Sequence, residues 1–187
     1  MMPELMSTDS WMAAHGSGLL VVLPLMVAFI VAIFPRSKFG ARAAWFAVLA
    51  TGLACTAISL AFLIHVKLHG PVDYFIGGWT PPFGISYRID GLSAPILFLI
   101  SSVSVLCTIY ALPSVLAEVE PKKRALFYAT FLVSFAGLLG VVVTADAFNV
   151  FVFLEISSIS TYVLVAMGKS RDRRALKAAF NYLIMGS

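Results

Sequence analysis

Residues 147–167 read AFNVFVFLEISSISTYVLVAM, an apolar run whose only acidic or basic side chain is Glu155, near its middle. About 20 helical residues cross the hydrocarbon core of a bilayer, so this run predicts a transmembrane helix. A carboxylate at mid-membrane costs about 3 kcal/mol even on lenient insertion scales, and such a residue usually serves ion or proton movement. Glu155 is therefore the first candidate for a functional residue.

Further apolar runs of membrane length lie on the N-terminal side of this helix. They cover residues 18–34, 43–64, 92–116 and 125–144, and each predicts a transmembrane helix, although the first is short. The sequence is 60% hydrophobic and 12% charged, outside the usual range of soluble domains. We therefore expect an all-α polytopic membrane protein with five complete transmembrane helices.

Residues 175–187 begin a sixth apolar helix. At 1.5 Å per residue this run reaches only about 20 Å, less than the hydrocarbon core of a membrane. A helix that ended inside hydrocarbon would leave its last carbonyl groups unpaired. We therefore expect residues 1–187 to form a single incomplete membrane domain.

The main segment outside these helices is residues 70–91, GPVDYFIGGWTPPFGISYRIDG. Its partial alternation of apolar and polar residues, interrupted by Gly and Pro pairs, predicts a small external β-hairpin. Two strands are too few to be stable alone, so the hairpin should rest on the helices. Tyr74, Trp79 and Tyr87 are expected near the lipid headgroups.

Several polar residues at helix ends have structural interpretations. Asp90 or Ser93 is expected to cap the helix that follows the hairpin, and Asp146 the helix that carries Glu155. His65 and His69 end the second helix. We interpret them as interfacial polar residues in preference to metal ligands, because they form an isolated pair in the sequence.

The basic residues predict how the chain is oriented in the membrane. Eleven of the 13 Lys and Arg residues follow the first, third and fifth helices: Arg36, Lys38, Arg42, Lys122, Lys123, Arg124, Lys169, Arg171, Arg173, Arg174 and Lys177. Only Lys67 and Arg88 lie on the other side. The positive-inside rule therefore places these three loops in the cytoplasm and the N-terminus outside. The net charge of +4 follows from this bias and does not indicate a nucleic-acid partner.

The helical period extends the candidate site beyond Glu155. Ser158 and Tyr162 share its face towards the predicted cytoplasmic end. Burial disfavours the charged form of a carboxyl group, which is the condition for reversible proton uptake. We therefore expect Glu155 to transfer protons, with Ser158 and Tyr162 supporting its hydrogen bonds. The alternative is a protonated Glu155 that only holds neighbouring helices together.

Other kinds of site find no support in the sequence. There is no glycine-rich nucleotide loop and no nucleophile–base constellation. Cys55 and Cys107 stand singly in separate apolar runs, which favours a packing role over metal or disulfide chemistry. We expect no cofactor, no metal site and no enzyme activity of the chain alone.

Three segments together resemble a known family. They are GWTPPFGISYRIDGLS at residues 78–93, TADAFNVFVFLEISS at residues 144–158 and RALKAAFNY at residues 174–182. In this order they resemble the N-terminal third of the antiporter-like subunits of Mrp-type multisubunit Na⁺/H⁺ antiporters, complex I and membrane-bound hydrogenases. The likeness is strongest to the D-type membrane protein of the Mrp antiporter.

This resemblance implies a fold of about fourteen transmembrane helices with inverted repeats, of which the chain holds the beginning. It also implies that Glu155 is the family's helix-five glutamate, which pairs with a lysine on a later helix. The sequence given stops before that lysine. Lys177 is not identified with it, because it belongs to the cytoplasmic flank and is expected to snorkel towards the headgroups.

The implied function is a proton-translocating subunit, or the N-terminal fragment of one, of a multisubunit monovalent cation/proton antiporter. Its partners would be the other subunits, the lipid of the inner membrane, protons and Na⁺. The first alternative is a proton-pumping subunit of a complex I-like dehydrogenase or a membrane-bound hydrogenase. The second, from another class, is a structural or assembly subunit that transports nothing.

Overall fold

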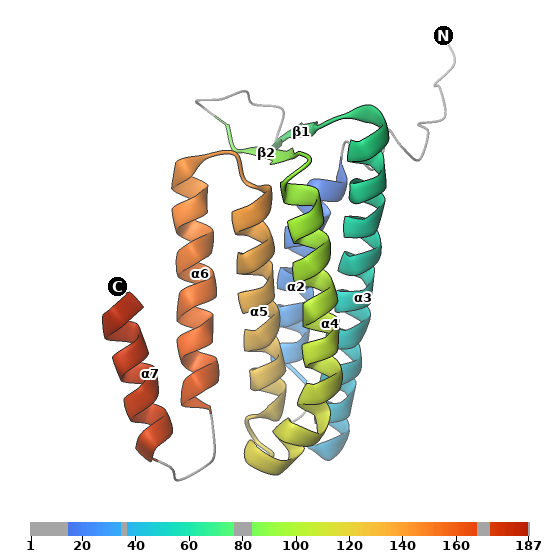
Figure 1. Ribbon diagram of the computed structural model, residues 1–187. Coiled ribbons are helices and arrows are strands. Elements are labelled where there is room, and N and C mark those ends of the chain that lie inside the picture. The colour runs from blue at the N-terminus through green and yellow to red at the C-terminus, as the bar shows by residue number, and fades with distance from the viewer. Residues whose placement is uncertain (1–14, 35–36, 77–83, 168–172, 187) are drawn as a thin grey trace.

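The computed structural model describes residues 15–34, 37–76, 84–167 and 173–186. Its elements are α2 (Ser17–Ala32), α3 (Lys38–His69), β1 (Val72–Phe75), β2 (Ser86–Ile89), α4 (Ser93–Glu118), α5 (Arg124–Val143), α6 (Ala147–Ala166) and α7 (Arg173–Gly186). The helices stand side by side, and the two strands lie across one end of them (Figure 1). Among the residues named above, Arg36, Trp79, Lys169 and Arg171 lie outside the described ranges.

The expected all-α membrane fold with a small hairpin is confirmed. Within the described residues, α3, α4, α5 and α6 are long and apolar enough to cross a membrane. Helix α2 is a shorter apolar helix of 16 residues. The expected helix bounds differ most at α3, which has 32 residues in place of residues 43–64.

The extra length of α3 has a local cause at each end. Ser37 precedes the helix with an extended backbone, and its hydroxyl accepts a hydrogen bond from the Gly40 amide at 3.1 Å. At the other end the helix continues to Gly70, whose φ of 91° turns the chain towards β1. Counting apolar residues alone missed these polar end turns, which make the helix about 48 Å long.

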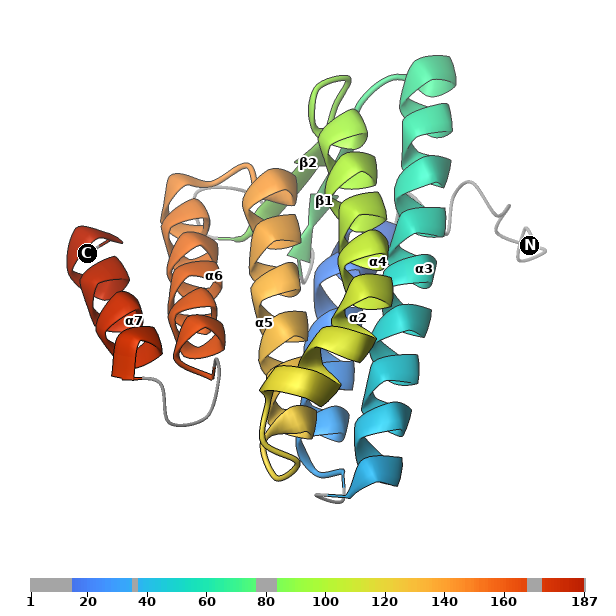
Figure 2. The ribbon, with the colours of Figure 1, turned by 60° about the horizontal axis from the view of Figure 1, so that its bottom comes forward.

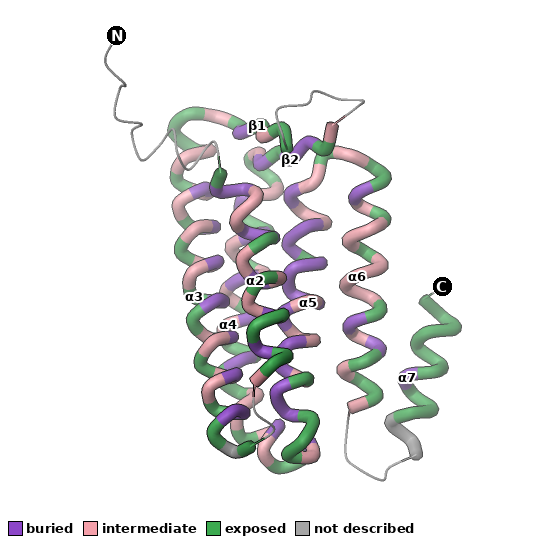
Figure 3. Tube along the Cα trace, turned by 180° about the vertical axis from the view of Figure 1, so that it is seen from behind, coloured by how far each residue is buried: buried purple, intermediate pink, exposed green. Residues whose placement is uncertain are grey.

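Helix α5 is the centre of the packing, with α2 and α6 as its main neighbours and α3 and α4 also in contact. Its inward-facing side chains are fully buried, as are those of α2 and α4 that meet them, with Leu20, Leu97, Leu132 and Leu139 all at 0% exposure. Figure 3 shows this core as purple segments gathered on α5 and its neighbours.

Helix α7 lies at the edge of the bundle and packs mainly against α6 (Figure 2). Along both helices most side chains are exposed or half-buried, in contrast to α5. Of the described parts of the fold, the α6–α7 side is therefore the least covered.

The hairpin is tied to the bundle by main-chain contacts. Strands β1 and β2 pair antiparallel, with Val72 opposite Ile89 and Phe75 opposite Ser86. On its other edge β2 meets the turn between α5 and α6. There Tyr87 forms a bridge with Thr144, and the Ala145 amide donates to the Ser86 carbonyl at 3.0 Å. This arrangement meets the expectation that two strands need support from the helices.

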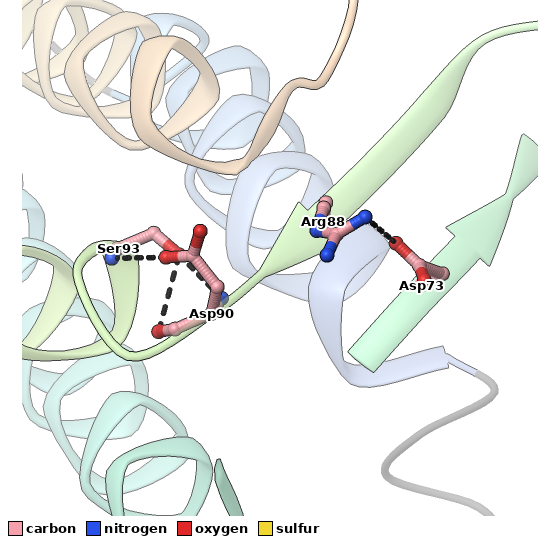
Figure 4. Close-up of polar contacts among 4 residues, drawn as sticks. All are labelled: Asp73, Arg88, Asp90 and Ser93. Atoms are coloured by element: carbon pink, nitrogen blue, oxygen red, sulfur yellow. Dashed lines mark hydrogen bonds and ion pairs between the residues drawn. The ribbon is translucent and has the colours of Figure 1, made fainter. Parts of the chain in front are cut away.

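Asp90 fixes the link between β2 and α4. Its carboxylate accepts hydrogen bonds from the Leu92 and Ser93 amides, both at 2.9 Å, and from the Ser93 hydroxyl (Figure 4). The Ser93 and Leu92 amides, which favour the charged form, lower the pKa of Asp90 below its ordinary value. The nearby pair of Arg88 and Asp73, 3.8 Å apart and half-exposed, contributes little to stability.

Arg124 has a structural role that the charge pattern did not indicate. The sequence places it among the basic loop residues, yet its side chain is buried at 8% exposure. Its Nε donates to the Val119 carbonyl at 3.0 Å, and its terminal nitrogen donates to the Leu116 carbonyl at 2.8 Å. Arg124 thus pairs carbonyl groups at the C-terminal end of α4, where a positive charge also suits the helix dipole.

Candidate functional site

Helix α6 holds the candidate site. Asp146 caps its first turn as expected, accepting hydrogen bonds from the Phe148 and Asn149 amides and from the Asn149 side chain. Glu155 follows about 12 Å along the axis from the first residue of α6, close to the middle of the helix. Its side chain is half-buried. Within the described residues its carboxylate makes no hydrogen bond or ion pair.

One face of α6 is closed against α5. The Ser134 and Thr161 hydroxyl oxygens lie 3.3 Å apart across this interface. A methyl group added at Gly137 would lie 2.8 Å from the Ser157 amide nitrogen, and Gly140 packs directly under the ring of Phe153. The two glycines therefore allow the helices to approach at backbone distance.

The opposite face of α6 is turned towards α7. Tyr162, Val163 and Ala166 line an apolar groove of about 690 Å³ between the two helices. The Tyr162 ring meets that of Tyr182 edge-on at 5.3 Å. Its hydroxyl lies against Gly186.

Glu155 belongs to this second face. It precedes Tyr162 by seven residues, which at about 100° per residue is only about 20° short of two full turns. Relative to Phe153, which contacts α5, Glu155 is rotated by about 200°. The mid-span carboxylate thus lies on the α7 side of α6 and away from the closed α5 interface.

The supporting residues share this face with Glu155, but no contact with it is seen. Ser158 is half-buried and makes no hydrogen bond within the described part of the chain. Tyr162 is buried at 9% exposure and directs its hydroxyl towards α7. Their role in ordering hydrogen bonds around Glu155 remains a prediction. Towards the hairpin end, Phe148 and Phe151 on the same helix are 71% and 61% exposed.

The α5–α6 interface was not anticipated from the sequence. Gly137 and Gly140 stand three residues apart in an apolar run, with Ser134 one turn earlier. Small residues gathered on one face of a membrane helix are typical of close contacts between helices. This pattern would have identified the face of α5 that receives α6.

Metal binding by a larger cluster finds no support in the described residues, because no group of three or more His, Cys, Asp or Glu side chains comes together there. Cys55 is buried and Cys107 exposed, on different helices, and both are free thiols. The fold and the site together define a multi-pass helical membrane protein with one acid at mid-span.

Comparison with known proteins gives a consistent result. The chain is 38% identical over 177 residues to "NADH-quinone oxidoreductase subunit N" of Desulforudis audaxviator (strain MP104C), covering 94% of the chain and 34% of that protein. It is 32% identical over 168 residues to "Putative antiporter subunit mnhD2" of Staphylococcus aureus (strain MRSA252), covering 89% and 32%. No protein-family profile matches the chain.

Two solved structures share the fold. The membrane-bound sulfane sulfur reductase, described as an archaeal respiratory membrane complex, matches with a TM-score of 0.78 at 29% identity, over 90% of this chain and 33% of that one. The Mrp complex from Dietzia sp. DQ12-45-1b matches with a TM-score of 0.77 at 24% identity, over 96% and 32%.

The resemblance to antiporter-like membrane subunits inferred from the three segments is therefore confirmed. The chain spans about a third of the length of the curated relatives that it matches.

Proposed function

We propose that the chain is part of a proton-translocating subunit of a multisubunit monovalent cation/proton antiporter. The observation that carries the proposal is the place of Glu155: near the middle of a membrane-length helix, half-buried, and on the face directed away from the α5 interface. The likeness to antiporter subunits supports the same class.

The packing of α6 suits a carboxyl group that changes its proton. The α5 face is occupied by close backbone contacts and by the Ser134–Thr161 hydroxyl pair. An acid there would be fixed in place. Glu155 instead faces the less covered side, where a partner cation or a proton donor can reach it. An isolated charge at this depth is costly. Glu155 is therefore stable there in two states: ionised beside a positive partner, or neutral with a bound proton.

The partner of Glu155 is proposed to be a basic residue of the longer subunit, supplied from the α7 side. The described residues of α7 include Lys177, which lines the groove together with Leu176 and Phe180. We assign Lys177 to the flank of the helix. It precedes Gly186, which lies against the Tyr162 hydroxyl, by nine positions, or about 14 Å along the helix.

We place the chain in the inner membrane with the N-terminus outside and the basic loops in the cytoplasm. Arg42, Lys122 and Lys123 lie at the end of the bundle opposite the hairpin, whereas Lys67 and Arg88 lie at the hairpin end (Figure 1). This segregation supports the orientation given by the positive-inside rule.

A respiratory role is the second candidate, and the 38% identity to a subunit of an NADH-quinone oxidoreductase favours it. Glu155 would then carry protons within a complex whose redox chemistry takes place in other subunits. The chain itself would still act as a transporter part. The two candidates differ in the driving reaction and share the proton site.

The test is the Glu155→Gln substitution in the full subunit, assembled with its partner subunits in proteoliposomes. Proton movement is followed with a pH-sensitive dye, driven first by a Na⁺ gradient and then by quinone reduction. We expect transport to fall about a hundredfold. Glu118→Gln, at the exposed cytoplasmic end of α4, is the matched control and should transport normally.

The driving force that supports dye quenching distinguishes the antiporter from the respiratory candidate. Undiminished transport by the assembled Glu155→Gln complex would reject Glu155 as the proton site. If the unsubstituted complex assembles normally but moves no protons under either driving force, a structural role is favoured. Ser158→Ala and Tyr162→Phe should each reduce transport by a smaller factor if they order the hydrogen bonds of Glu155.

A further inference from the structure

The hairpin end of α3 carries a pair of imidazoles that the proposed function does not use. His65 and His69 lie four residues apart in the last two turns of the helix. Their rings are stacked, with centroids 4.7 Å apart and planes inclined by 27°. His65 is half-buried and His69 is exposed. The sequence alone gave only the spacing, whereas the structure shows the two rings against one another.

The spacing of the two histidines on the helix suits a chelate. Residues four apart share a face of an α-helix, with Cβ atoms about 6 Å apart. Imidazole nitrogens bind Zn²⁺ at about 2.0–2.1 Å and also bind Cu²⁺ and Ni²⁺. Two rings already in contact can direct one nitrogen each at a common ion by small side-chain rotations. We propose that His65 and His69 form a surface binding site for a divalent transition-metal ion.

The neighbouring lysine of α3 does not oppose a cation at this position. Lys67 is two residues from each histidine, so it projects about 160° away around the helix and its charge points elsewhere. No third His, Cys, Asp or Glu joins the pair within the described residues. The ion would therefore keep water in its remaining positions. Because two nitrogen ligands impose little geometry, the affinity should follow the general order, with Cu²⁺ above both Ni²⁺ and Zn²⁺.

The location gives the site a structural consequence. The last turn of α3 ends at Gly70, whose amide donates to the Val66 carbonyl at 3.1 Å before the chain turns into β1. An ion bridging residues 65 and 69 would staple this turn in its helical form. The site would thus hold the helix end from which the hairpin leaves, at a distance from Glu155 and independent of its chemistry.

The experiment is a Cu²⁺ titration of the full chain, purified in detergent without a histidine tag, followed by electron paramagnetic resonance. We expect one Cu²⁺ per chain with hyperfine structure from two nitrogens. His65→Asn and His69→Asn should each weaken binding at least about tenfold, since even the loss of outer-shell partners costs that much in metal sites. His15→Asn changes the third histidine of the chain and should leave binding unchanged.

A second variant separates loss of the chelate from loss of folding. Exchanging residues 67 and 69, by Lys67→His together with His69→Lys, keeps the composition but moves one ring about 160° around the helix, away from His65. We expect this chain to elute normally on size exclusion and to lose the two-nitrogen signal. Binding of equal strength in this variant, or in the double His65→Asn/His69→Asn chain, would overturn the proposal, as would failure of the unsubstituted chain to bind Cu²⁺.

Discussion

The close contact of α5 with α6 makes a quantitative prediction for Gly137→Ala. The added methyl group would lie 2.8 Å from the Ser157 nitrogen and 3.0 Å from the Phe153 carbonyl oxygen. Both are backbone atoms and cannot rotate away. Ordinary contact begins at 3.4 Å, so α6 must move by about 0.6 Å. Overpacking of this kind costs about 1–3 kcal/mol.

The intrinsic preference of the residue acts in the opposite direction. Alanine stabilises a helix interior by up to about 1 kcal/mol relative to glycine. The net expectation is therefore a loss of up to about 2 kcal/mol in the free energy of unfolding. Gly52→Ala is the matched control, because it gains the same helix preference and its tight contact is with a Val105 methyl group at 3.1 Å, whereas the Val105 backbone stays at 3.9 Å or more.

The assay is reversible unfolding in mixed micelles with an increasing SDS fraction. A second measurement follows the distance between α5 and α6 directly, through disulfide formation after Ser134→Cys and Thr161→Cys in a chain without Cys55 and Cys107. The parent hydroxyl oxygens are 3.3 Å apart, so cross-linking should be rapid and should slow with Gly137→Ala. The packing argument is refuted if Gly137→Ala unfolds at the same or a higher SDS fraction than the unsubstituted chain and cross-links as fast.

Three further predictions concern the helix ends. Arg124→Gln removes charged hydrogen bonds to the Val119 and Leu116 carbonyls and should cost about 2–3 kcal/mol in the same unfolding assay, with Arg124→Lys recovering part of the loss. Asp146→Ala removes the cap of α6 and should cost about 1 kcal/mol, whereas Asp146→Ser should cost much less. Hydrogen bonds from Ser93 and Leu92 lower the pKa of Asp90 in the folded protein below its ordinary value of 3.8. The ionised carboxylate therefore stabilises the fold at pH values above 3.8, and this contribution is lost as the pH falls through the lower pKa of the folded state. The protection of the Leu92 and Ser93 amides from exchange, relative to their intrinsic exchange rates, should fall in that acid range, and Asp90→Asn should abolish this pH dependence of the protection.

The sequence predicted the apolar helices well because hydrophobic length and bilayer thickness leave few alternatives. Residues 92–116, 125–144 and 147–167 agree with α4, α5 and α6 to within about two residues. The capping role of Asp146 was also predicted, since its side chain acts on the amides next to it. Such local features need no knowledge of the rest of the fold.

What the sequence did not predict depends on which helices meet. Arg124 is buried because the C-terminal end of α4 lies close to the start of α5. A count of charges along the sequence carries no information about that contact. The direction of the Tyr162 hydroxyl follows from the position of α7. The same limit applies to Glu155: its face follows from the helical period, whereas the basic partner proposed for it depends on helix contacts that the described residues do not include.

The bridge between β2 and the α5–α6 turn adds to the contacts that set the axial register of the bundle. Apolar helices in lipid gain no hydrophobic energy from packing together, so their register depends on close packing and on directional hydrogen bonds. At this end of the helices the Ala145 amide donates such a bond to the Ser86 carbonyl. Helix α6 begins at Ala147, two residues after Ala145, and Glu155 lies about 12 Å further along it, a little under half the thickness of the hydrocarbon core. The β1–β2 hairpin at the end of the bundle thus helps to fix the depth at which Glu155 lies along the membrane-spanning helices.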